Sequence, residues 1–191
     1  AVIDTYAGRT DPTGRNNATY AAMVEGIDDL VGRVLTKLAE RGLEKDTAVF
    51  YFSDNGGVER IAFNGGFRRG KGWLYEAGIV EPLIVKLPGR IRPGATDTTP
   101  ISSVDFYPTI LELTGAADVR GHTVDGVSLV PLFEGGTLDR DALYWHYPHY
   151  SNAGGPPCGA IREGKYKLIE FFEDGKLELY DLEADPGEKR D

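Results

Sequence analysis

Residues that cross-link a chain or bind soft metal ions are scarce in this sequence. Its 191 residues include one cysteine, one methionine and three histidines. A single cysteine excludes an internal disulfide framework, and no two histidines stand at the spacing of paired metal ligands. A hydrophobic core must therefore hold the fold together, and the hydrophobic content of 41% suffices to build one.

Long apolar runs and an excess of positive charge are also absent. No apolar run approaches the ~18 residues of a membrane span, and residues 1–20 lack the pattern of a signal peptide. The chain has 21 Lys and Arg against 30 Asp and Glu, a formal net charge of −9. Because binding to nucleic-acid phosphates needs a basic face, we exclude nucleic acid as a partner.

A helix is predicted for residues 17–42, where apolar side chains recur at helical spacing. We expect this stripe to lie in the core and Gly42 to end the helix. Residues 1–16 are polar and turn-rich and predict a loop. The apolar stripe consists of Tyr20, Met23, Val24, Ile27, Leu30, Val31, Val34, Leu35 and Leu38.

Buried strands are predicted at residues 47–53 and 81–87, and a second helix at residues 104–115. This helix would begin after a serine cap and end at Gly115, with Asp105 in a structural role near its positive end. Since strands and helices alternate, the predicted fold class is α/β, with part of a mostly parallel sheet flanked by helices.

Short β-like runs replace this pattern from about residue 140. Their close spacing predicts a small antiparallel sheet with a hairpin turn at Glu173–Lys176. We therefore divide the chain into an α/β portion, residues 1–139, and a C-terminal subdomain, residues 140–191. The predicted strands are residues 142–146, 159–162, 166–172 and 177–181.

Asp54 and Asn55 follow directly on the first predicted strand and precede two glycines. The C-terminal edge of such a strand is where an open α/β sheet usually places its ligand. Carboxylate and carboxamide oxygens are hard donors, so the pair suits an ion such as Ca²⁺. Asp-Asn-Gly-Gly is also strong turn chemistry and could serve only to end the strand.

Residues 64–78 form a glycine-rich stretch that carries Arg68, Arg69 and Lys71. Glycines permit close approach, and the cationic side chains can donate hydrogen bonds to a tetrahedral oxyanion. A cation site and an anion site would then be neighbours. The alternative is that Lys71 is simply a solvent-exposed loop lysine.

Taken in order, these segments resemble the sulfatase family of the alkaline-phosphatase-like superfamily. No single motif is decisive, but the ordered set is specific and covers nearly the whole chain. The matching segments are Ser53–Gly57, Asn64–Gly78 with its Arg-Gly-Lys core, Pro82–Gly89, Asp105–Gly115, Tyr166–Ile169 and Leu179–Glu188.

The resemblance implies a calcium-dependent sulfuric ester hydrolase. Sulfatases use a formylglycine made from Cys or Ser in a Cys/Ser-x-Pro-x-Arg motif, and residues 1–20 contain neither this motif nor the family's further Asp pair. The chain therefore looks like the C-terminal portion of a sulfatase, inactive alone. By the same resemblance Asp54 and Asn55 would be calcium ligands, and Lys71 would contact the sulfate and assist the leaving oxygen. Arg68 would bind substrate or brace its loop.

Two segments depart from the family pattern. Ala77 and Val80 stand where the family usually has Gly and Arg. This departure weakens any claim that the family's local network of bracing contacts is kept in this segment. Cys158-Gly-Ala-Ile-Arg162 has the spacing of a permissive modification motif. It lies after the lysine motif, however, so we interpret Cys158 as an unmodified thiol.

The histidines lie mainly in the C-terminal part. His146 and His149 stand among aromatic residues and could line a carbohydrate-binding cleft, or could belong to a partly buried aromatic cluster. His122 is predicted to lie in a surface loop.

Three functions stay open at this point: a sulfatase acting on a sulfated glycan or aryl sulfate, a phosphodiesterase or phosphomonoesterase of the same superfamily, and a non-catalytic calcium or sulfated-glycan binding module. Phosphohydrolases of the superfamily commonly have Asp-His where this chain has Asp54-Asn55, and imidazole suits Zn²⁺ whereas a carboxamide suits Ca²⁺. We favour the sulfatase, and by resemblance a periplasmic or secreted location.

Overall fold

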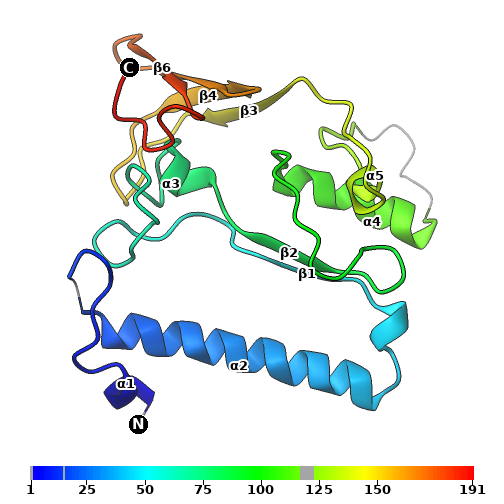
Figure 1. Cartoon of the computed structure of the whole chain (residues 1–191). Helices are drawn as coiled ribbons and strands as arrows, with labels where there is room; N and C mark the ends of the chain where they lie inside the picture. Colours follow the sequence, from blue (N-terminus) through cyan, green and yellow to red (C-terminus); the bar gives the residue numbers. More distant parts are fainter. Residues whose placement is uncertain (1, 15, 117–122) are drawn as a thin grey trace.

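The computed structural model describes residues 2–14, 16–116 and 123–191, so His122 lies outside the described residues. A long helix, a central strand pair and a C-terminal sheet follow one another in space (Figure 1). The helices are α1 (Val2–Thr5), α2 (Ala18–Glu40), α3 (Glu76–Ile79), α4 (Phe106–Thr114) and α5 (Val130–Phe133), with 3₁₀ turns η1 (Glu44–Asp46) and η2 (Ser103–Asp105). The strands are β1 (Val49–Phe52), β2 (Leu83–Lys86), β3 (Ala142–Tyr147), β4 (Cys158–Glu163), β5 (Tyr166–Phe171) and β6 (Leu177–Asp181).

Helix α2 confirms the predicted helix at residues 17–42. The Asn17 side chain caps it by accepting the Tyr20 N–H at 3.0 Å. Gly42 follows the C-terminal end with φ +68°, the left-handed conformation that glycine adopts without strain. The loop predicted before this helix instead contains the short helix α1.

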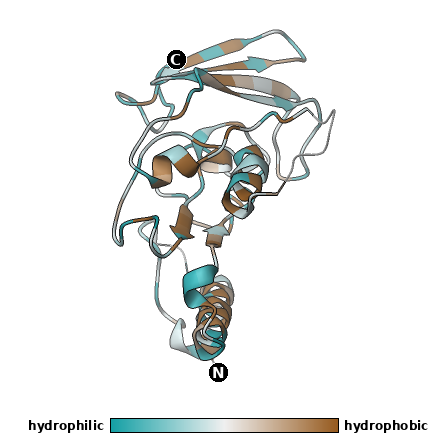
Figure 2. Cartoon of the chain, turned by 90° about the vertical axis from the view of Figure 1, so that its right-hand side faces the viewer, coloured by the Kyte–Doolittle hydropathy of each residue, from teal (hydrophilic) through white to brown (hydrophobic). Residues whose placement is uncertain are grey.

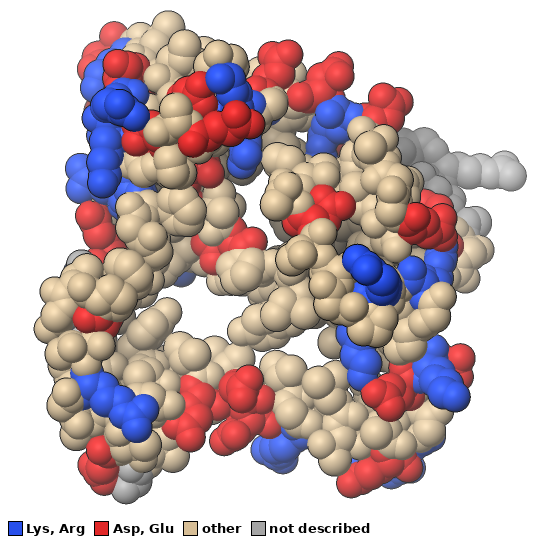
Figure 3. Space-filling view, in the orientation of Figure 1, with Lys and Arg blue, Asp and Glu red and all other residues tan. Residues whose placement is uncertain are grey.

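The predicted burial of the α2 stripe is wrong. Met23, Leu30 and Val34 are 63%, 56% and 57% exposed, and hydrophobic residues are visible along the helix in Figure 2. Among the described elements α2 contacts only α1 and η1, and the space-filling view leaves open gaps between α2 and the strands above it (Figure 3). Periodicity gave the helix correctly, but burial also requires an element that packs against the apolar face.

No helix in the described part of the chain combines the length and the apolar character needed to cross a membrane.

The predicted parallel sheet is also wrong for this chain. Strands β1 and β2 form a two-stranded antiparallel pair, with Val49 opposite Lys86 and Phe52 opposite Leu83. A parallel pair needs a crossover segment, usually a helix, that carries the chain back to the same end. The connection here holds only the short α3 and folds beside the end of β1, so β2 returns in the opposite direction.

Helix α4 confirms the second predicted helix, and Gly115 ends it with φ +66°. Asp105, at its start, is fully buried. Its carboxylate accepts the N–H groups of Ser102 (2.7 Å) and Val127 (3.0 Å) and pairs with Arg140 Nη1 at 2.7 Å. Asp105 thus ties the helix start to the segment that enters the C-terminal sheet.

The C-terminal sheet confirms the predicted antiparallel subdomain. Its strands follow the order β3-β4-β5-β6, each antiparallel to the next. One face packs against Leu74 and Tyr75 from the glycine-rich stretch. The same cluster contains the sheet residues Cys158, Ala160, Ile169 and Tyr180, and Leu182, which follows β6. The core of residues 140–191 therefore includes side chains from earlier in the chain, and the division at residue 140 stays a prediction.

Replacing Asp105 by Ala should lower the free energy of unfolding by about 3–5 kcal/mol, because Arg140 would lose its buried partner. Urea unfolding of the full-length protein measures the change. Asp139→Ala removes the exposed neighbouring carboxylate and should change the free energy by less than about 0.5 kcal/mol. Equal effects of the two substitutions would contradict the role given to Asp105.

Candidate functional site

The turn after β1 positions Asp54 and Asn55. Ser53 Oγ donates a hydrogen bond to the Asn55 carbonyl at 2.9 Å. The Gly56 N–H donates to the Gly78 carbonyl at 3.2 Å. A Cβ on Gly56 would lie 1.7 Å from the Ala77 oxygen, so only glycine permits this contact.

The glycine-rich stretch folds against the same turn. The Lys71 N–H donates to the Gly57 carbonyl at 3.1 Å, and Asn64 Nδ2 donates to that carbonyl at 2.9 Å. A Cβ on Gly70 would lie 2.2 Å from the Gly57 oxygen. The Lys71 backbone is thus bonded to Gly57, which lies two positions after Asn55. The Lys71 side chain is exposed.

A further carboxylate lies close to this turn. Burial raises the pKa of Glu81, the charge of Asp54 raises it further, and a hydrogen bond with Ser53 opposes the rise. Near the end of β1 the structure therefore offers two carboxylates, Asp54 and Glu81, whose negative charges repel each other, beside the neutral Asn55 carboxamide.

These donors fit part of a calcium shell by their chemistry. Ca²⁺ takes about 6–8 oxygen ligands, and Asp54 and Asn55 supply only some of them. Within residues 2–14, 16–116 and 123–191 no group of three or more His, Cys, Asp or Glu side chains could hold a metal ion. The chain alone should therefore bind Ca²⁺ weakly.

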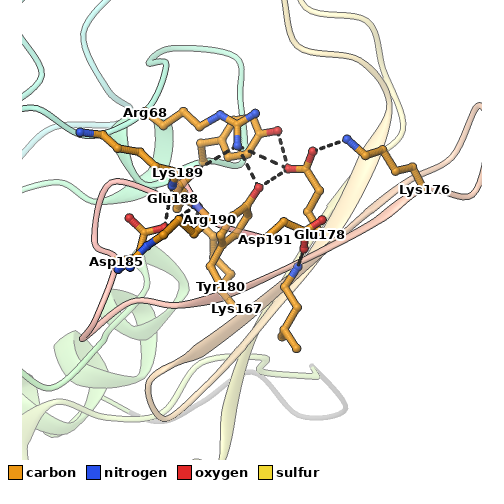
Figure 4. Close-up of polar contacts among 12 residues, drawn as sticks. Arg68, Lys167, Lys176, Glu178, Tyr180, Asp185, Glu188, Lys189, Arg190 and Asp191 are labelled. Atoms are coloured by element: carbon orange, nitrogen blue, oxygen red, sulfur yellow. Dashed lines mark hydrogen bonds and ion pairs between the residues drawn. The ribbon is translucent and has the colours of Figure 1, made fainter.

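Arg68 is directed toward the C-terminal sheet (Figure 4). Its Nη1 donates to the Tyr180 hydroxyl at 2.8 Å and to the Glu188 carbonyl at 2.9 Å. The guanidinium carbon lies 4.0 Å from the centre of the Tyr75 ring. Of the two roles considered for Arg68, this geometry favours bracing of the loop over contact with a substrate.

An open cavity of about 500 Å³ lies beside this brace. Its lining residues are Glu59, Gly66, Phe67, Arg68, Arg69, Gly187, Glu188 and Lys189. The guanidinium of Arg69 lies 4.6 Å from the Trp73 ring centre, and its Nη1 is 3.6 Å from Glu59 Oε2. Neither Asp54, Asn55 nor Lys71 lines the cavity.

The two C-terminal histidines are exposed. The His146 ring lies 5.5 Å from that of Phe172, and the His149 ring 5.9 Å from that of Tyr147. The loop after His149 reaches the residue that follows Lys71, because a Cβ on Gly72 would lie 2.1 Å from Ser151 Oγ. The structure thus brings that loop to the basic stretch.

Two family models match the chain: Sulfatase over residues 2–116, and N-sulphoglucosamine sulphohydrolase, C-terminal, over residues 66–191. The chain belongs to the sulfatase family. It is 36% identical over 190 residues to a sulfatase of Formosa agariphila, covering 90% of this chain and 34% of that one. It is 35% identical over 210 residues to human arylsulfatase A, covering 96% and 40% respectively.

Solved structures agree with this assignment. BT4656 in complex with its substrate D-glucosamine-2-N,6-O-disulfate superposes with a TM-score of 0.80 at 32% identity, covering 91% of this chain and 35% of that chain. The sulfatase chain thus spans 34% to 40% of the length of these two relatives and of this solved structure.

This sulfatase chain also contains a buried polar network that its motifs did not indicate. Glu178 Oε2 accepts hydrogen bonds from the hydroxyls of Tyr75 and Tyr180, both at 2.6 Å, and Glu178 Oε1 accepts one from Lys176 at 2.7 Å. Lys167 and Glu178 occupy inward positions of β5 and β6, in step with Ile169 and Tyr180. Each stands two positions before a buried residue, and this period-2 spacing was the signal that could have revealed them.

Glu178 holds a negative charge in this network. Burial alone would raise its pKa, but hydrogen bonds from Lys176, Tyr180 and Tyr75 and the charge of Arg68 lower it to about 2. Burial and the Glu178 carboxylate raise the pKa of both tyrosines.

Cys158 is not placed for catalysis in the sulfatase chain. It begins β4 and is 2% exposed. Burial raises the pKa of its thiol, so the reactive thiolate is disfavoured.

Glu178 should make the protein sensitive to acid. Its pKa is lower in the folded than in the unfolded chain, so its stabilisation is present above about pH 4 and is lost as the pH falls toward 2. The lost free energy should be about 2–3 kcal/mol. Urea unfolding between pH 6 and pH 2 should therefore show a shallower fall in stability for Glu178→Gln than for wild type.

Glu183→Gln, which changes an exposed carboxylate, should follow the wild-type pH profile. If Glu178→Gln follows it as well, the low pKa of Glu178 does not contribute to stability.

Proposed function

We propose that the complete protein hydrolyses sulfate esters, with Asp54 and Asn55 as two of its calcium ligands and Lys71 as a catalytic residue. The observation that carries the proposal is the backbone contact between the two motifs. Gly56 bonds to Gly78 at 3.2 Å and Lys71 to Gly57 at 3.1 Å. In a member of the sulfatase family, this contact supports one site for cation and sulfate.

Each residue has a distinct part in this proposal. Calcium and formylglycine, when present, would supply charge stabilisation and the nucleophile. The Asp54 carboxylate and Asn55 carboxamide hold the cation through oxygen. The Lys71 ammonium donates hydrogen bonds to the sulfate oxygens, where negative charge grows in the transition state. Arg68 keeps the loop of Lys71 against the C-terminal sheet.

Sulfated carbohydrate is the substrate class that we favour. The substrate bound in the similar BT4656 structure is a disulfated glucosamine. His146 and His149 are exposed beside aromatic rings and could contact a sugar. We further propose a periplasmic or secreted location, where such substrates occur.

Lys71→Ala in the full-length protein should lower turnover of an aryl sulfate by about 10²–10³-fold, the loss seen when one transition-state donor is removed. Initial rates with p-nitrophenyl sulfate measure it. Lys45→Ala removes an exposed lysine of η1 and should leave turnover unchanged. Wild-type turnover by the Lys71 variant would refute the catalytic role.

Asp54→Ala should raise the calcium concentration needed for half-maximal activity at least tenfold, because the ion loses a charged ligand. The shift is measured by titrating calcium into metal-stripped protein and recording activity and binding heat. Hydrolysis of the matching aryl phosphate by the wild-type protein is measured in parallel, because a preference for phosphate would indicate a phosphohydrolase. Unchanged calcium affinity would remove Asp54 from the ligand set.

A further inference from the structure

A buried ionic cluster links three segments that lie far apart in the sequence. Lys167 Nζ is 2.7 Å from Glu76 Oε1 and 2.6 Å from Glu188 Oε1. Glu188 Oε2 accepts the N–H of Glu76 at 2.7 Å. Lys167 and Glu188 are fully buried, and Glu76 is 5% exposed.

The charges of the cluster balance. Arg162 Nη1 lies 3.8 Å from Glu76 Oε2 and adds a second cation to two carboxylates. Well-packed apolar side chains could fill the same space without losing the hydration of four charged groups. Ion pairs and a charged hydrogen bond, however, fix the distances and directions between the side chains more narrowly than apolar contacts do.

Glu188 holds the basic loop at two points. Its carboxylate bonds to Glu76, and its main-chain carbonyl accepts the Arg68 guanidinium at 2.9 Å. Lys71 lies between Arg68 and Glu76 in the sequence. Figure 4 shows Arg68, Glu188 and Tyr180 converging at this junction.

The backbone is strained at the same place. Arg69 and Glu188, with φ of +65° and +52°, are the non-glycine residues of positive φ in the described chain. Both line the 500 Å³ cavity between the loop and the C-terminal tail. Such conformations persist only where surrounding contacts enforce them, and they concentrate at functional sites.

The Lys71 side chain has no comparable anchor. In the described structure its ammonium forms no hydrogen bond or ion pair with protein, and its backbone has the single bond to Gly57. The position of the ammonium therefore depends on how firmly the loop is held on both sides.

We propose that Glu188 is a positioning residue for Lys71, acting through Arg68 and through the buried Glu76–Lys167 pair. The inference rests on the proposed catalytic role of Lys71. It gives the segment around Glu188 a part in sulfate-ester turnover without requiring a contact between Glu188 and the substrate.

The test uses Glu188→Gln in the full-length protein. The amide keeps the size of the side chain and leaves the main-chain contact with Arg68 in place. It removes the charge that faces Lys167, and it gives the Glu76 N–H a weaker, neutral acceptor in place of a carboxylate. With p-nitrophenyl sulfate and saturating calcium, kcat should fall by about 10- to 100-fold, since misplacement of a catalytic group by about 1 Å has effects of that order. KM should stay within about twofold, because the variant retains every group that contacts sulfate.

Hydrogen exchange provides a readout that does not depend on activity. Glu188→Gln should increase amide exchange at least tenfold in residues 68–76 and leave β3 and β4 unchanged. Glu183→Gln, in the same tail segment but exposed, should match wild type in both assays. Glu188→Asp, which restores the charge on a shorter side chain, should recover part of the lost kcat.

Three results for Glu188→Gln would overturn the proposal. The first is a kcat within twofold of wild type, and the second is a rise in KM without a fall in kcat. The third is faster amide exchange throughout the chain, which would indicate general destabilisation. Failure of the proposed function has a different signature, because wild-type protein would then not cleave the sulfate. In that event, a Glu188→Gln variant with faster amide exchange only in residues 68–76 would still establish that Glu188 holds the loop.

Discussion

The site depends on the close approach of two glycine-containing backbones. Gly56 and Gly57 lie against Gly70, Ala77 and Gly78 at distances that no Cβ could occupy. This contact leaves no room for a side chain between the two backbones. In the proposed site it is the reason to place a cation at the acidic turn beside an anion at the basic loop. Opposite charges held in such a site would stabilise one another more strongly the less water lies between them.

A second constraint holds the loop from the other side. Apolar contacts of Leu74 and Tyr75 with the C-terminal sheet bury the middle of the stretch, while Arg68 and Glu76 bind charged and polar partners. The hydrophobic contacts provide most of the stability, and the polar contacts select one geometry among the arrangements that would bury the same area. The C-terminal sheet therefore serves as the support of the loop and is more than an appended subdomain.

The sequence predicted what local patterns determine. Helices α2 and α4, their glycine ends and the antiparallel C-terminal sheet follow from periodicity and turn chemistry. Burial of the α2 stripe and the direction of β2 did not, because both depend on what else packs nearby. An alternation of strands and helices implies a parallel sheet only when the connecting helix crosses the sheet, and α3 is too short to do so.

Arg68 shows why the site itself could be predicted only in part. Its motif marked it as a residue of the anion loop, and a guanidinium in such a loop is equally suited to sulfate or to protein partners. The partners that occupy it are Tyr180 and Glu188, 112 and 120 positions away. Spacing within a motif carries no information about contacts over that distance. The motif could therefore mark the loop and suggest a role for Lys71, but it could not reveal what holds them. The signal that was available lay in β5 and β6, where Lys167 and Glu178 take inward positions among apolar neighbours. A charged residue at such a position requires a partner, and for Lys167 that partner includes Glu76 of the loop itself.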